Sequence, residues 1–219
     1  MKIVNNIIRA LSVLAAAAAL ALYFFFGKSK GELIGSTITV IISAITIFFV
    51  TFIPSVLKKR NIIMSKSLYI IILVAIVLSM GGGFIFRFYE IFSYYDTIVH
   101  FLNGMNIVII VFVILSYYAK EPERYAVPII IISILAAISL GTLWEIYEFI
   151  VDVVATNSNM QRFRDVQTGI DYVGQAALKD TMIDLLVDTL GAVIAGILLY
   201  IDSISKRRFI KTIILKNIE

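Results

Sequence analysis

Six long apolar stretches set the fold class of this chain. They cover residues 7–26, 33–57, 68–86, 98–118, 125–151 and 182–201, and each has about the 20 residues that a helix needs to cross a hydrocarbon core of about 30 Å. With 60% hydrophobic residues, the chain is too apolar for a soluble globular domain, where that fraction is about 45 to 50%. Membrane β-strands alternate over about ten residues, and these runs do not. We predict an all-α membrane protein with one domain, a bundle of six transmembrane helices.

Basic residues predict how this bundle is oriented. Of the 19 Lys and Arg, 13 lie in segments on the side of the N-terminus and six on the other side. Because Lys and Arg concentrate in cytoplasmic loops, we expect both termini in the cytoplasm. The net charge of +4 is then explained by topology, and no nucleic-acid partner is needed. The first stretch lacks a small-residue cleavage pattern, so we expect a retained helix rather than a cleaved signal peptide.

Two segments outside the spans have open interpretations. The outer loop, residues 153–179, is polar, and it is either a lid over the outer ends of the helices or a disordered connector. The basic tail, residues 202–219, is either a short helix on the anionic leaflet or a solvated anchor. Near the outer end of the third helix, Arg87 and Glu90 either pair with each other or supply a counter-charge. The glycines at 81–83 either bend this helix or serve packing.

Three of the stretches carry ionisable residues, which are costly inside a membrane and usually mark a functional site. With the predicted orientation they all lie near the outer ends of the fourth, fifth and sixth helices: Asp96 and His100, then Glu145, Glu148 and Asp152, then Asp180, Asp184 and Asp188. At about 100° per residue, each set falls on one face of its helix. No water in the hydrocarbon can satisfy these groups, so the three faces should turn toward one another or toward a pocket open to the outside.

Carboxylates with one imidazole form a ligand set for a divalent cation such as Mg, Mn, Ca or Zn. We assign a metal-binding role to Asp96, His100, Asp180 and Asp184, and a catalytic role to Glu145, Glu148 and Asp188. Alternatives stay open for three of the residues: His100 as a structural hydrogen-bonding residue, Asp180 as a helix N-cap, and Asp152 as a group solvated at the membrane surface. The aromatic residues nearby are expected to form the outer aromatic belt: Tyr94, Tyr95, Trp144 and Tyr147.

The sequence also limits the chemistry. Cysteine is absent, which excludes disulfides and thiolate metal sites. There is no Gly-x-Ser-x-Gly string and no glycine-rich phosphate loop. Metal-activated water and carboxylate acid-base chemistry are what the residues permit.

Four strings within residues 94–195 carry a family resemblance: Tyr95-Asp96-x-x-x-His100-Phe101-x-x-Gly104, Glu145-x-x-Glu148, Asp180-Thr181-x-x-Asp184 and Leu190-Gly191-Ala192. In this order and spacing they resemble the YjdF-like family of bacterial inner-membrane proteins. A more distant similarity to VanZ-like proteins rests on the Asp-x-x-x-His element and the later acidic helix. The resemblance implies a six-helix protein of the bacterial cytoplasmic (inner) membrane and names no reaction. Among the acidic residues, Asp188 is the one that the resemblance supports least.

Three functions are compatible with these features. The first is a divalent-metal-dependent enzyme that acts from the outer face on a lipid or lipid-linked substrate. The second is a non-catalytic binding or accessory membrane protein, and the third is a cation-coupled or proton-coupled transporter. The lipid bilayer is the expected environment in each case, and we rank the enzyme first and the transporter last because carriers usually bind near the midplane.

Overall fold

The computed structural model describes residues 1–26, 31–119, 122–154, 158–165, 167–205 and 209–218. The helices are α1 Lys2–Phe26, α2 Gly31–Val50, α3 Ile53–Lys59, α4 Lys66–Ile76, α5 Phe88–Ile91, α6 Tyr95–Tyr118, α7 Ala126–Val154 and α8 Gln175–Ile204. A π-helical segment η2 (Val77–Ile85) continues α4, and a short 3-10 helix η3 (Ile210–Thr212) lies in the tail. Two short strands are β1 Ile62–Met64 and β2 Leu215–Asn217.

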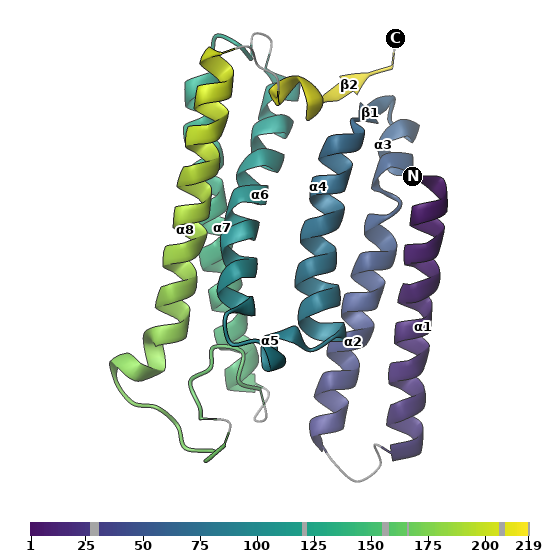
Figure 1. Cartoon of the computed structure of the whole chain (residues 1–219), viewed down its shortest axis with the longest axis vertical. Helices are drawn as coiled ribbons and strands as arrows, with labels where there is room; N and C mark the ends of the chain where they lie inside the picture. The colour runs from purple at the N-terminus through teal and green to yellow at the C-terminus, as the bar shows by residue number, and fades with distance from the viewer. Residues whose placement is uncertain (27–30, 120–121, 155–157, 166, 206–208, 219) are drawn as a thin grey trace.

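The long helices run side by side, and both ends of the chain lie at the same end of the bundle (Figure 1). Five described helices are long and apolar enough to cross a membrane, and α2 with α3 forms a sixth crossing if this bent pair is one span. The predicted helical membrane bundle is therefore confirmed. The last helix begins at Gln175, about two turns before the predicted residue 182, so the outer loop is shorter than predicted.

The second predicted span, residues 33–57, is wrong as a continuous helix. It bends by 43° between α2 and α3, where Pro54 occupies the first turn of α3 and has no N–H to continue the preceding hydrogen bonds. Arg9 of α1 supports the break: its Nη2 donates to the Thr51 carbonyl oxygen (3.1 Å), its Nε donates to Thr51 Oγ1 (2.7 Å), and its guanidinium lies 3.8 Å from the centre of the Phe52 ring. The bend thus keeps its polar groups paired.

The glycines at 81–83 lie in η2 and let two tyrosines approach the backbone. A Cβ added at Gly82 would lie 2.0 Å from Tyr95 Oη, and one at Gly83 would lie 2.0 Å from Tyr89 Cε2. The Tyr95 hydroxyl donates to the carbonyl oxygen of Leu78 (2.9 Å). Close packing of neighbouring side chains is therefore the role that the structure gives Gly82 and Gly83. Tyr95 is a packing residue here rather than a member of the outer belt.

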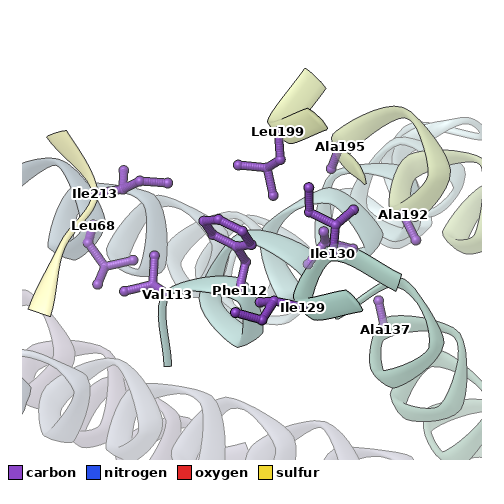
Figure 2. Close-up of a cluster of buried hydrophobic side chains, with 11 residues drawn as sticks. Leu68, Phe112, Val113, Ile129, Ile130, Ala137, Ala192, Ala195, Leu199 and Ile213 are labelled. Atoms are coloured by element: carbon purple, nitrogen blue, oxygen red, sulfur yellow. The ribbon is translucent and has the colours of Figure 1, made fainter. Parts of the chain in front are cut away.

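The apolar core lies between α4, α6, α7 and α8 and includes Ile213 of the tail (Figure 2). Phe112, Ile130 and Leu199 fill its centre. Small residues on the facing helices, among them Ala137, Ala192 and Ala195, are at most 2% exposed. Because lipid tails are as apolar as the side chains, close packing of such small residues is what holds helices together in a bilayer.

The tail differs from both predictions for residues 202–219. Strand β2 pairs antiparallel with β1, with Asn217 opposite Ile62, and Ile213 is 1% exposed and belongs to the core. The Ser65 hydroxyl oxygen accepts a hydrogen bond from the Ile214 N–H (3.1 Å). The tail therefore packs onto the bundle and pairs with the segment that connects α3 to α4. The basic residues at 206–208 lie outside the described residues.

Candidate functional site

Helices α6, α7 and α8 bring six ionisable side chains together in the half of the bundle remote from the chain termini. These residues, each at most 9% exposed, are Asp96, His100, Glu145, Glu148, Asp184 and Asp188. Glycines let α6 and α8 touch backbone to backbone: a Cβ at Gly104 would lie 2.3 Å from the Asp188 carbonyl oxygen, and one at Gly191 would lie 2.2 Å from that of Phe101. The three polar faces expected from helical phase do meet.

His100 is at the centre of this cluster. Its Nδ1 lies 3.1 Å from Asp188 Oδ2, and because an ionised carboxylate can only accept, we assign the Nδ1 proton to this hydrogen bond. Its Nε2 faces the other way, 3.6 Å from Asp96 Oδ1 and 3.9 Å from Glu145 Oε1. Asp188 thus fixes the ring orientation and leaves Nε2 directed at two further carboxylates.

The distances suit a cation. The cluster contains two groups of three residues, and within each group the ligand atoms all lie within 4.8 Å of one another. One group is Asp96, His100 and Asp184, and the other is His100, Glu145 and Glu148. Ligand atoms about 2.0 to 2.6 Å from one ion are at most about 4 to 5 Å apart, so either group fits an ion with small side-chain adjustments. His100 belongs to both groups.

Glu145 adds an independent observation. Both of its carboxylate oxygens are buried and have no hydrogen-bond partner within the described part of the chain. An unpaired buried carboxylate is costly, and it persists when a cation or a proton compensates its charge. The Glu145 carboxylate thus has no hydrogen bond within the described part of the chain, and its charge contact there is His100 Nε2, 3.9 Å from Oε1.

Two residues of α7 support the cluster in ways that the sequence analysis missed. A Cβ at Gly141 would lie 2.6 Å from Asp188 Oδ2, so this glycine makes room for the carboxylate that holds His100. Trp144 Nε1 donates to Glu148 Oε1 (2.8 Å), so Trp144 is not only a belt residue. Gly141 lies one turn before Glu145, and this i, i+4 relation is the signal that would have found it.

Arg162 of the outer loop supplies the positive charge nearest the cluster. Its Nη2 lies 3.3 Å from Asp96 Oδ2 and its Nη1 lies 3.4 Å from Asp180 Oδ1. Its Nη2 also donates to the carbonyl oxygen of Tyr89 (3.3 Å). The hydroxyl of the same tyrosine has a raised pKa, because it is buried and lies near the negative charge of Asp96. From the sequence, Arg162 is one of the six basic residues expected on the outer side. Arg87 pairs with Glu90 instead, so it is not the counter-charge.

The outer loop is folded over this end of the bundle. The Asp152 carboxylate accepts hydrogen bonds from the backbone N–H groups of Met160 (2.8 Å) and Gln161 (2.9 Å), and Gln161 Nε2 donates to Thr181 Oγ1 of α8 (2.8 Å). A disordered connector is therefore wrong for residues 158–165 and 167–174, whereas residues 155–157 and 166 lie outside the description. Asp152 anchors the loop, is half-buried and lies outside the cluster.

The N-cap reading of Asp180 is wrong. Helix α8 already begins at Gln175 with Gly174 as its N-cap, so Asp180 lies in the second turn. Its Oδ1 faces Arg162, and its Oδ2 is buried without a hydrogen-bond partner among the described residues. Asp180 thus lies at the outer edge of the cluster and is the point where the outer loop contacts it.

Comparison with known proteins identifies a family. The family model described as "Predicted membrane protein (DUF2238)" matches residues 8–204. A protein of Thermotoga maritima, printed as "Uncharacterized protein", is 31% identical over 113 residues, which is 52% of this chain and 50% of that protein. The match thus spans about half the length of this relative. No solved structure matches.

Proposed function

The chain belongs to the DUF2238 family of predicted membrane proteins, and from that premise we propose that its helices α6, α7 and α8 hold a divalent cation for a reaction on a lipid or lipid-linked substrate. The supporting observation is the orientation of His100, whose Nδ1 is 3.1 Å from Asp188 while its Nε2 faces Asp96 and the unpaired carboxylate of Glu145. Histidine ligands of metals characteristically carry such a carboxylate on the other ring nitrogen.

The proposed roles of the residues follow from their contacts. His100, Glu145 and Glu148 form one ligand group, and Asp96 and Asp184 with His100 form the other. Asp188 is a positioning residue, which revises the catalytic role expected from the sequence. A bound divalent ion would supply a Lewis acid that polarises an ester or phosphoryl oxygen. The carboxylates of the ligand group that does not hold the ion would then be available to transfer protons to or from the substrate.

The placement in the cell is part of the proposal. The excess of Lys and Arg on the side of the termini supports cytoplasmic termini and a cation site near the outer face. The four strings within residues 94–195 support a bacterial inner-membrane protein close to the YjdF-like family. The VanZ-like similarity adds no argument about the site.

A non-catalytic binding or accessory protein is the second candidate. It is favoured by the ion pairs of Arg162 with Asp96 and Asp180, because an internal cation compensates part of the buried negative charge without a metal. Transport has less support, since the described inner halves of α6, α7 and α8 are filled by an apolar core that includes Phe112, Ile130 and Leu199.

Cation binding by the purified full-length protein tests the proposal. After treatment with EDTA, equilibrium dialysis against Mn²⁺ or Zn²⁺ should show a bound ion, and Glu145→Gln should weaken its affinity about tenfold or more. The matched control is Glu90→Gln, which removes a carboxylate from an exposed pair and should leave the affinity unchanged. Without the ion, Glu145→Gln should raise the melting temperature, because it removes a buried carboxylate charge that has no hydrogen-bond partner among the described residues. A structural lock would instead lose stability, and absence of ion binding would contradict the proposal.

A further inference from the structure

A pocket of about 410 Å³ lies between the outer loop and the first turns of α8, next to the acidic cluster. It is lined by Arg162, Tyr172, Ala176, Lys179, Asp180 and Ile183. It shares Arg162 and Asp180 with the contacts that reach the cluster. The pocket, called the loop pocket below, therefore adjoins the proposed cation site through these two residues.

The charges of the loop pocket favour an anion. Two cations, Arg162 and Lys179, face one carboxylate, Asp180, and Asp180 Oδ1 already faces Arg162 Nη1 at 3.4 Å. Lys179 forms no ion pair within the described part of the chain. Helix α8 begins here without a side-chain cap at Gly174, and the N-terminus of a helix adds partial positive charge. The net charge of the pocket is positive.

Arg162 is held in place to meet a ligand. The contacts to Asp96, Asp180 and the Tyr89 carbonyl oxygen use its Nη1 and Nη2, and none of them uses its Nε–H. A guanidinium carries five N–H donors in a fixed plane that matches phosphate oxygens. The side chain is 33% exposed, so its remaining donors are accessible from the pocket while its orientation is fixed from the other side.

The surroundings indicate where the ligand comes from. Ile183 lines the pocket, and the neighbouring α8 side chains Leu178 and Met182 are 58% and 51% exposed. Exposed apolar side chains on a spanning helix face the bilayer, so the loop pocket opens where lipid headgroups lie. Its volume exceeds that of a phosphate ion alone and suits a headgroup.

We propose that the loop pocket binds the phosphate group of a lipid headgroup through Arg162 and Lys179, and that it thereby presents this group to the acidic cluster. This inference rests on the proposed function in one respect, since the phosphate group would be the substrate group of the cation site. Arg162 then links the two sites, with one side directed at Asp96 and Asp180 and the other at the ligand. The substrate class is a phosphate ester carried by a membrane lipid.

Calorimetric titration of the full-length protein in a non-ionic detergent tests this pocket without the metal. With EDTA present, two probes are compared: inorganic phosphate and dihexanoyl phosphatidic acid below its micelle concentration. The wild-type protein should bind, and Lys179→Gln should weaken the affinity about tenfold because a charge-assisted contact is lost. The control Arg87→Gln removes one positive charge from an exposed pair at the same end of the bundle and should have no effect.

The possible results distinguish a lipid headgroup from free phosphate as the ligand. They also distinguish failure of the loop pocket from failure of the cation site. Tighter binding of the lipid probe assigns the pocket to a headgroup, and equal binding assigns it to free phosphate; both keep the phosphate site. If neither probe binds, or if Lys179→Gln binds like the wild type, the inference is overturned. Glu145→Gln should still bind the probes after losing the cation, so failure of the cation site leaves the phosphate result intact.

Discussion

At the scale of single residues, the cluster is governed by what each buried polar atom can accept or donate. Asp188 accepts from His100 Nδ1, and Trp144 donates to Glu148, but the two oxygens of Glu145 have no described partner. A buried group without a partner costs more than a paired group gains. The missing hydrogen-bond partners of Glu145, rather than the number of acidic residues, therefore indicate a ligand.

Asp188→Asn tests whether the carboxylate positions His100. An amide accepts a hydrogen bond more weakly than a carboxylate, so Nδ1 protonation should become incomplete and cation affinity should fall about 10-fold to 100-fold. The chain contains one His, so ¹⁵N NMR of histidine-labelled protein reports the tautomer of His100 alone.

The control for this change is Asp171→Asn. Asp171 pairs with Arg164 in the outer loop, and its side chain is 56% exposed, so the imidazole signals should stay as in the wild type. If Asp188→Asn leaves both the tautomer and the affinity unchanged, then Asp188 does not set the orientation of the ring.

The sequence predicted some residues of this site and missed others, for a physical reason. Asp96 and His100 could be placed on one helix face because α-helical phase is regular, and the same holds for Glu145 and Glu148. Arg162 could not be placed, because it has a left-handed backbone (φ 46°) in a loop without periodicity. In an irregular loop, the spacing of residues in the sequence does not determine the direction in which a side chain points.

At the scale of elements, apolar length predicted that helices exist but not where they break or begin. The bend before Pro54 is tolerated because Arg9, from another helix, pairs with Thr51, a contact that no local pattern contains. Helix α8 begins at Gln175, in a segment too polar for the hydrocarbon, because helical structure can extend beyond the bilayer. Tertiary contacts and polar helix ends account for both differences.

The outer loop and the tail offer a matched test of how an aspartate anchors a segment. Asp152 accepts two backbone N–H groups of the outer loop, and Asp202 accepts those of Phe209 (3.1 Å) and Ile210 (2.9 Å) in the tail. Asp152→Ala should raise the population of the open loop about tenfold, because two hydrogen bonds that hold the loop are lost. The rate of proteolysis is proportional to this population when the loop closes faster than the protease cleaves it. Trypsin cleavage after Arg162 or Arg164 should accelerate accordingly.

Asp202→Ala serves as the control for the outer loop. It loses the same kind of contact at the other end of the bundle, so it should accelerate cleavage after Lys211 and leave the rate at Arg162 and Arg164 unchanged. Equal cleavage of the outer loop in wild type and Asp152→Ala would show that Asp152 does not hold it.

At the scale of the whole molecule, the two ends of the bundle differ in kind. The end with the chain termini is closed by the pairing of β1 with β2 and by the apolar core that includes Ile213. The other end carries the buried acids, the outer loop and the loop pocket. The ionisable cluster and the loop pocket thus lie together at the end remote from the chain termini, where one charged ligand would meet both.

The absence of cysteine makes this orientation measurable residue by residue. Gln167→Cys places a thiol at an exposed position of the outer loop, and Lys59→Cys places one at the exposed end of α3. Because Lys and Arg concentrate on the cytoplasmic side, a membrane-impermeant maleimide should label the cysteine at 167 in intact cells and label that at 59 only after permeabilisation. The reverse pattern would place the cation site and the loop pocket in the cytoplasm, and the substrate would then have to come from the inner leaflet.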